Sequence, residues 1–211
     1  MTLAITTELR GRWLLERRPV EPGRALEDRA LDRELVERAQ AGDETAFAEL
    51  AARIGDRLYA TAQHILHDTG RAEDAVQQAM ISIWRQLPRL TDPDRFLPWA
   101  YRIVVRAAYA EARRRRLWIL RSVPTPSQRA FSPDHASGVA DRDELERSFR
   151  RLPIDHRAVL VLKHYAGLSN PEIAEALGIP EGTVRSRLHH AMRGLRAARD
   201  ADARRPARDS S

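Results

Sequence analysis

The chain has 211 residues, of which 43% are hydrophobic, 31% charged and 6% aromatic. A chain of this length forms one medium-sized domain or two small ones, and its many Ala, Leu, Arg and Glu residues favour helices. Because it contains no cysteine, disulfides, thiolate zinc sites and cysteine nucleophiles are excluded.

The positive charge is concentrated in two separate segments. Lys and Arg total 36 against 30 Asp and Glu, and the formal charge is +6 in residues 99–121 and +4 in residues 181–211. Two basic segments separated by acidic or neutral ones indicate a polyanionic partner. No apolar run approaches the roughly 20 residues that cross a bilayer, so we expect no membrane insertion and a cytoplasmic location.

The first part of the chain predicts two helices after a poorly ordered extension at residues 1–28. Asp32 is the expected N-cap of the first helix, which ends at Gly42. Asp43 is the expected cap of the second helix, in which apolar residues recur every three or four positions until Gly70 ends it.

Two further helices are expected on either side of a proline-rich loop. The third helix spans residues 71–87, after which Pro88, Pro93 and Pro98 force a loop. The fourth helix spans residues 98–118, and it is apolar in its first half and basic in its second half. We therefore expect the first half to pack against other helices and the second half to protrude.

The sequence predicts an all-α protein with two small helical domains on a flexible linker. The linker is indicated by several Pro, Ser and Gly residues with almost no hydrophobic periodicity. The predicted parts are an extension at 1–28, a first domain at 29–118, a linker at 119–140, a second domain at 141–199 and a polar tail at 200–211.

The segment SNPEIAEALGIPEGTVRSRLHHAMRGLR, residues 169–196, has the pattern of a helix-turn-helix. Ser169 or Asn170 caps the first helix, Gly178 allows the turn, and the second helix begins at about Gly182. The residues expected to point inward are Ile173, Ala174, Leu177, Val184, Leu188, Ala191 and Leu195.

The outer face of the second helix is cationic and could enter a major groove, where arginine pairs with guanine through two hydrogen bonds. The candidate DNA-contacting residues are Thr183, Arg185, Ser186, Arg187, His189, His190 and Arg193. The alternative is an ordinary helical hairpin whose arginines only face water. The spacing of the small and apolar residues, together with the cationic face, favours DNA binding.

Three segments of the first half carry a second pattern: DRELVERAQAGDETAFAEL (32–50), AEDAVQQAMISIW (72–84) and WAYRIVVRAAYAEARRRR (99–116). They resemble the conserved second region of the extracytoplasmic function sigma factors of bacterial RNA polymerase. The segment from residue 145 to about residue 199 is similar to the fourth region of the same family. The resemblance implies a factor that binds core RNA polymerase, recognises the minus-35 and minus-ten promoter elements and helps to open the promoter.

The resemblance also implies the partners. The AEDAVQQ helix would dock on the clamp helices of core RNA polymerase, with the flap as a further contact, and promoter DNA and an anti-sigma factor are the other candidate partners. The candidate polymerase-binding residues are Asp74, Gln77, Gln78 and Ile81. From the residues alone, a helix face that only meets solvent is the simpler interpretation of these side chains.

The loop at residues 88–95 and the helix after it correspond to the part of the family that captures unpaired bases of the minus-ten element. The candidate residues are Arg95, Trp99, Arg102, Arg106, Arg113, Arg114, Arg115 and Arg116. The last four are expected to contact backbone phosphates, with a solvated helix end as the alternative. The apolar stripe that holds Trp84 and Trp99 favours packing over base stacking.

Three positions depart from the family pattern. Arg106 and Ala110 stand where the family commonly has asparagine and aspartate, and His190 stands where relatives often have arginine. Arg185, Ser186 and His189 match positions that read the minus-35 element. Because the base-contacting positions differ, no promoter consensus is carried over from the family.

Two other function classes compete with the sigma factor. A stand-alone helix-turn-helix regulator explains residues 141–199 but leaves the AEDAVQQ helix and the arginines at 113–116 without a role. A helical metalloenzyme could hold a metal with His64 and His67, which are three residues apart, and Asp68 nearby, but the sequence shows neither a third ligand nor an open site. We therefore expect no catalytic residues, metal or cofactor.

Overall fold

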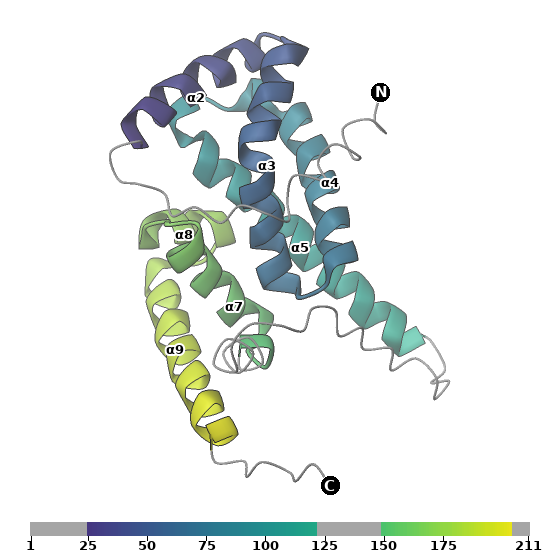
Figure 1. Ribbon diagram of the computed structural model, residues 1–211, viewed down its shortest axis with the longest axis vertical. Helices are drawn as coiled ribbons and strands as arrows, with labels where there is room; N and C mark the ends of the chain where they lie inside the picture. The colour runs from purple at the N-terminus through teal and green to yellow at the C-terminus, as the bar shows by residue number, and fades with distance from the viewer. Residues whose placement is uncertain (1–24, 122–148, 204–211) are drawn as a thin grey trace, which may run out of the picture. The chain divides into compact units, whose positions relative to one another are not determined.

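The computed structural model describes residues 25–121 and 149–203, which form helices and the short turns between them (Figure 1). Within these ranges there is no strand, and the predicted all-α class is confirmed. The expectations for residues 1–24, 122–148 and 204–211 fall outside the described residues.

Contacts between Cα atoms divide the chain into two compact units. Of the described residues, the first unit contains 25–56 and 84–96, and the second contains 57–83, 97–121 and 149–203. Helices α3 (Glu44–Leu66) and α4 (Thr69–Gln86) therefore contribute to both units. The domain boundaries inferred from the sequence stay a prediction.

Helix α2 (Ala25–Gln40) begins earlier than expected. Asp32 lies inside this helix, so the prediction that it is the N-cap is wrong. The preceding segment ALEDRAL consists mostly of good helix formers, which extend the helix toward the N-terminus. The helix ends two residues before Gly42, whose φ of +94° is accessible to glycine and strained for other residues.

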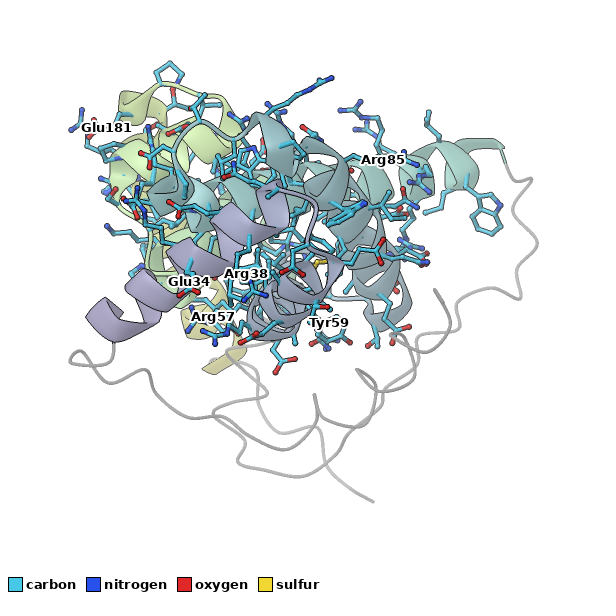
Figure 2. The ribbon with its side chains drawn as sticks, turned by 90° about the horizontal axis from the view of Figure 1, so that it is seen from above. Glu34, Arg38, Arg57, Tyr59, Arg85 and Glu181 are labelled. Carbon is cyan, nitrogen blue, oxygen red and sulfur yellow. The ribbon has the colours of Figure 1, made fainter. Side chains whose placement is uncertain are left out.

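The turn from α2 to α3 is fixed by Asp43, as predicted. Its Oδ1 accepts hydrogen bonds from the backbone N–H groups of Thr45 (2.9 Å) and Ala46 (3.0 Å). Arg38, labelled in Figure 2, donates from Nη2 to the other carboxylate oxygen at 2.6 Å. The backbone hydrogen bond from Ala46 and the Arg38 guanidinium hold the pKa of the Asp43 carboxyl below its ordinary value.

The turn from α3 to α4 is made by His67, which adopts a φ of 51°. Asp68 follows, and its Oδ1 accepts a hydrogen bond from the backbone N–H of Arg71 at 3.1 Å, which caps the start of α4. Gly70 lies in the first turn of α4, so the prediction that it ends the second helix is wrong. Histidine is one of the residues that enter the left-handed region more often than most, which makes the earlier turn possible.

Helix α5 (Phe96–Arg121) is buried in its first half and exposed in its second, as predicted. It begins two residues before Pro98, which lies in the first turn, where a missing N–H breaks no helical hydrogen bond. All side chains from residue 113 to residue 119 are exposed. The buried apolar residues of the helix are Phe96, Ala100, Tyr101, Ile103, Val104, Val105 and Ala108.

After residue 148, helix α7 (Ile154–Leu160) continues into a π-helical turn, η4 (Val161–Tyr165), followed by α8 (Asn170–Leu177) and α9 (Glu181–Ala203). Helix α9 contacts both α7 and α8. One apolar cluster joins α9 to the segment before it, and its members are Phe149, Leu152, Leu160, Leu188, Ala191 and Met192. None of the described helices combines the length and apolarity needed to cross a membrane.

Candidate nucleic-acid interface

The predicted helix-turn-helix is present in α8 and α9. Ser169 caps α8 in a capping box: its Oγ accepts from the backbone N–H of Glu172, and the Glu172 carboxylate accepts from the Ser169 backbone N–H at 2.7 Å. Gly178 ends α8 in the left-handed conformation, with a φ of +66°. Helix α9 begins at Glu181, one residue before the predicted Gly182.

The inward positions of the helix-turn-helix agree with the sequence pattern, with one addition. Ile173, Val184 and Ala191 are fully buried. Ala174, Leu177 and Leu188 are half-buried, and the side chain of Leu195 is outside the described residues. Ala176, which was not among the predicted inward positions, is 2% exposed and is more deeply buried than Ala174. Ala176 follows Ile173 by three residues, so the helical period that predicts a buried Ile173 also predicts a buried Ala176.

Close packing fixes the rotation of α9. A Cβ on Gly194 would lie 2.9 Å from Cδ2 of Leu152, closer than side-chain atoms approach one another. Arg187 on α9 pairs with Asp155 on α7, with Nη2 to Oδ2 at 3.4 Å, and its side chain is 27% exposed. The apolar contact and the ion pair together hold one side of α9 inward and leave the opposite side exposed.

The exposed side of α9 carries the predicted cationic surface, which we call the α9 face. Its members are Arg185, Ser186, His189, His190 and Arg193, all exposed. Thr183 and Arg187 were predicted with them but are half-buried. The α9 face combines guanidinium, hydroxyl and imidazole groups, which can donate to base edges and to phosphates.

Two side chains of the α9 face are preset by neighbours. Arg185 donates from Nη1 to Oε1 of Glu181 at 3.1 Å, one turn earlier on the helix (Figure 2 labels Glu181). The ring of His190 stacks on His156 of α7, with ring centroids 6.5 Å apart and planes 14° from parallel. The Glu181 contact is exposed and weak, so Arg185 can exchange it for a base at low cost.

A second cationic surface follows one side of α5. Trp99, Arg102, Arg106 and Arg113 are separated by three, four and seven residues, a spacing that places them on one face of α5. Together with Arg95, which lies in the turn just before the helix, we call them the α5 stripe. Arg95, Arg106 and Arg113 are exposed, and Trp99 and Arg102 are half-buried. The α5 stripe starts at the loop before the helix and ends in the exposed second half.

The four predicted phosphate-binding residues, Arg113–Arg116, are all exposed, and we call them the arginine run. Arg114 differs from the other three, because its Nη2 lies 2.7 Å from Oε1 of Glu111, a carboxylate whose side chain is only 7% exposed. Part of its charge is therefore already neutralised within α5. Within the described residues, Arg113, Arg115 and Arg116 form no ion pair of this kind.

The loop before α5, residues 87–95, consists of two short 3-10 turns, η2 (Leu87–Arg89) and η3 (Pro93–Arg95). We call it the α4–α5 loop. Asp92 caps η3, because its Oδ1 accepts from the backbone N–H of Asp94 at 3.0 Å. Leu87 is fully buried, whereas Arg89, Thr91 and Arg95 are exposed. The sequence predicted a loop here, and the exposed side chains of Arg89 and Thr91 were not among the predicted site residues.

The predicted polymerase-binding residues share one side of α4, which we call the α4 face. Asp74, Gln77, Gln78 and Ile81 are all exposed, and Ile81 is 37% exposed. The opposite side of the helix is buried at Ala72, Ala75, Val76, Ala79 and Ile83. Trp84 is half-buried, with its ring centroid 4.6 Å from that of Phe47, which agrees with its interpretation as a packing residue.

The described residues bring no metal-binding cluster together. Within residues 25–121 and 149–203, no group of three or more His, Asp or Glu side chains is arranged to hold a metal ion.

Two family models match the chain. Residues 50–117 match the model described as Sigma-70 region 2, and residues 142–195 match the model described as Sigma-70, region 4. The first match includes the α4 face and the α5 stripe, and the second includes the α9 face.

The chain is also similar to known sigma factors in sequence and to solved structures in fold. The RNA polymerase sigma-H factor of Pseudomonas aeruginosa is 33% identical over 177 residues, which is 78% of this chain and 91% of the relative. The ECF RNA polymerase sigma-E factor of Escherichia coli is 29% identical over 188 residues, covering 81% and 95%. The structure of CnrH in complex with the cytosolic domain of CnrY has a TM-score of 0.62 at 29% identity, covering 82% of this chain and 99% of that one.

A further structure supports the fold alone. The sigma factor RpoE in complex with the anti-sigma factor NepR from Bartonella quintana has a TM-score of 0.60 at 22% identity, covering 74% of this chain and 98% of that one.

Proposed function

Because this chain belongs to the extracytoplasmic function group of the sigma-70 family, we propose that it binds core RNA polymerase, recognises the minus-35 and minus-ten elements and helps to open the promoter. One observation carries the proposal. The two sigma-70 matches occur in the expected order, and each contains one of the two separate cationic helix surfaces.

At the minus-35 element, the α9 face enters the major groove. Arg185 exchanges its exposed contact with Glu181 for a guanine edge, and Ser186 and His189 contact neighbouring bases or phosphates. Arg187 was predicted to contact DNA, but its ion pair supports a positioning role instead. Its ion pair with Asp155 holds α9 against α7, so it orients the α9 face without contacting bases.

At the minus-ten element, the α4–α5 loop and the start of the α5 stripe hold an unpaired base. An extruded base needs an aromatic or apolar wall and polar groups at its edge. The arginines of the α5 stripe supply the polar groups. The apolar pattern favoured packing for Trp99, but this side chain is only half-buried and is the candidate wall. The arginine run contacts the phosphates at the upstream edge of the element. Phosphate contacts fix position and carry no sequence information directly.

The α4 face docks on the clamp helices of core polymerase, and the part of the chain that matches region 4 contacts the flap. A polar surface with one apolar anchor, Ile81, suits an interface between two soluble proteins. Binding to the polymerase is required because opening the promoter costs more free energy than this factor can supply alone. Separating ten base-pair steps costs about 14 kcal/mol, whereas a stacked base returns only about 1–3 kcal/mol, so the small factor must share the work with the polymerase.

Two further properties follow from this function. A sigma factor acts by binding, so we assign this chain no catalytic residue and no cofactor, and it works in the cytoplasm with the polymerase and the chromosome. An anti-sigma factor is a further candidate partner, because such partners are common among extracytoplasmic function sigma factors.

A selection experiment separates this function from the stand-alone regulator. The chain is mixed with a randomised DNA library with and without bacterial core RNA polymerase, and the complexes are separated by size before the DNA is sequenced. The sigma factor predicts co-elution with core polymerase and recovered DNA that carries two short elements at a fixed spacing. Recovery of the same DNA by the chain alone, with no co-elution, would support the stand-alone regulator instead.

A further inference from the structure

The α4–α5 loop must be held in place if it is to position a base. A binding site performs well only when its groups stay within about 0.5 Å of the productive geometry. The buried side chains of Leu87 and Phe96 anchor its two ends, but most of the residues between them are exposed. Beyond the hydrogen bonds within the loop itself, helix α2 touches both η2 and η3.

Gln40, at the end of α2, binds the first half of the loop. Its Nε2 donates hydrogen bonds to the backbone carbonyl oxygens of Leu87 (3.1 Å) and Leu90 (2.6 Å). An amide nitrogen carries two hydrogens, so one side chain can serve both carbonyls. Within the η2 turn, the Leu90 N–H donates to the Leu87 carbonyl at 3.0 Å. The half-buried Gln40 side chain therefore bridges the two ends of a turn that also has its own hydrogen bond.

Arg33, two turns earlier on α2, binds the second half of the loop. Its Nη1 donates to Oδ2 of Asp94 at 2.8 Å, while its Nε donates to Oε1 of Glu37 at 2.9 Å. Glu37 thus orients the guanidinium toward the loop. Arg33, Glu37 and Gln40 are spaced by four and three residues, so one side of α2 follows the loop from η3 to η2.

The exposure of the Arg33–Asp94 ion pair indicates that this contact positions the loop more than it stabilises the fold. The side chains of Arg33 and Asp94 are 50% and 59% exposed, and exposed ion pairs contribute little to the free energy of unfolding. We propose that α2 is a brace that holds the α4–α5 loop in its base-capturing geometry, with Gln40 as the main positioning residue and Arg33 as the second. The proposal rests on the proposed function of the loop at the minus-ten element.

The substitution Gln40→Met tests the brace, because it keeps the length of the side chain and removes both donors. Gln86→Met is the matched control: Gln86 is exposed, directly precedes the loop, and makes no side-chain hydrogen bond to its turn. Arg33→Met is compared with Arg38→Met, which removes an ion pair of α2 that ends on Asp43 instead of the loop.

Two readouts are taken on the full-length chain. The first is hydrogen exchange of the backbone amides at residues 87–95 in the free protein. The second is open-complex formation by the holoenzyme on the promoter that the wild type selects from a randomised library, and on versions with single base changes in the minus-ten element. Losing both hydrogen bonds of Gln40 should reduce discrimination between these promoters about fivefold to tenfold, with a smaller loss for Arg33→Met.

The brace predicts faster exchange at residues 87–95 and weaker base discrimination in Gln40→Met, with affinity for core polymerase unchanged and both controls like the wild type. If Gln40→Met and Gln86→Met gave the same hydrogen exchange and the same base discrimination, the proposal that α2 braces the loop would be wrong. A parallel loss of melting temperature, polymerase affinity and discrimination would also overturn it, because it would show a purely structural role. If the wild-type holoenzyme opens no selected DNA, the proposed function fails, and hydrogen exchange alone still decides whether α2 holds the loop.

Discussion

The α9 face and the arginine run are both cationic, but they differ in chemistry and in what lies behind them. The α9 face mixes arginine, serine and histidine, and it stands on the buried side chains of Val184 and Ala191. The arginine run consists of four successive arginines in a stretch where every side chain from 113 to 119 is exposed. Successive helical residues point about 100° apart, so these arginines cannot all meet one surface.

This difference shows that positive charge alone does not identify a base-reading surface. A mixed face held rigidly by packing can match the donors and acceptors of a base edge. A set of identical cations around a helix end can follow the phosphate backbone, which has the same charge at every sequence. We therefore expect substitutions in the α9 face to change sequence preference and substitutions in the arginine run to change affinity uniformly.

The largest effect is expected for substitutions in the α4 face, measured as affinity for core polymerase. Unlike the two cationic surfaces, the α4 face carries almost no charge. The double substitution Gln77→Arg with Gln78→Arg should weaken binding to core polymerase on the order of 100-fold, because two bulky charged side chains would have to lose their water at the docked interface. The matched control is Gln63→Arg with Gln86→Arg, which adds the same charge at exposed positions outside the α4 face. Affinity for core polymerase is measured by fluorescence anisotropy, and equal affinities for the two variants would refute the docking assignment.

Next in size is Arg185→Ala. Loss of a bidentate contact to guanine should cost about 1–3 kcal/mol and relax the preference at one base pair of the minus-35 element. Arg187→Ala should leave base preference unchanged, since its guanidinium is directed to Asp155. Binding of the holoenzyme to a panel of single-base promoter variants checks both. The same loss for Arg185→Ala on every sequence would mean that Arg185 contacts phosphate only.

The rigid support behind the α9 face is tested by Gly194→Ala. The new methyl group would lie 2.9 Å from Leu152 Cδ2, and such overpacking typically costs about 1–3 kcal/mol in the free energy of unfolding. Gly182→Ala is the matched control, because a Cβ there meets no atom within 4 Å, and it should stabilise the helix by up to about 1 kcal/mol. Thermal denaturation measures both variants. Equal melting temperatures would show that α9 can move away from Leu152 without cost.

The smallest effect is expected for single arginines of the run. Arg113→Ala should weaken holoenzyme binding by a similar factor on every promoter and lower the slope of log affinity against log salt by about 1. Arg114→Ala should have less effect, because Arg114 is already paired with the buried carboxylate of Glu111. Salt titrations of DNA binding compare the two variants. A change in base preference for Arg113→Ala would remove the distinction between the two cationic surfaces.

The helices and the helix-turn-helix could be predicted from sequence because their signals are local. The capping by Asp43 and Ser169, the turn at Gly178 and the buried positions Val184 and Ala191 follow from cap chemistry and the 3.6-residue period. The start of α2 was misplaced because a run of good helix formers outweighed a single capping residue at Asp32.

Other features had no local signal. The turn at His67 depends on a left-handed histidine where the sequence offered a glycine three residues later. The pairing of Gln40 with the carbonyls of Leu87 and Leu90 joins residues 47 and 50 positions apart. Hydrogen bonds to backbone carbonyls place no requirement on the identity of the residues that accept them, so no sequence pattern could reveal this contact.

The most direct test of the account is run-off transcription by the reconstituted holoenzyme on its selected promoter, with and without five extra base pairs between the two elements. Five base pairs rotate one element by about half a helical turn relative to the other. If the α9 face and the α5 stripe act together on one promoter through the polymerase, the original spacing gives RNA from one defined start site and the insertion abolishes it. RNA that is equally abundant at both spacings, or no defined start site at either, would contradict the account.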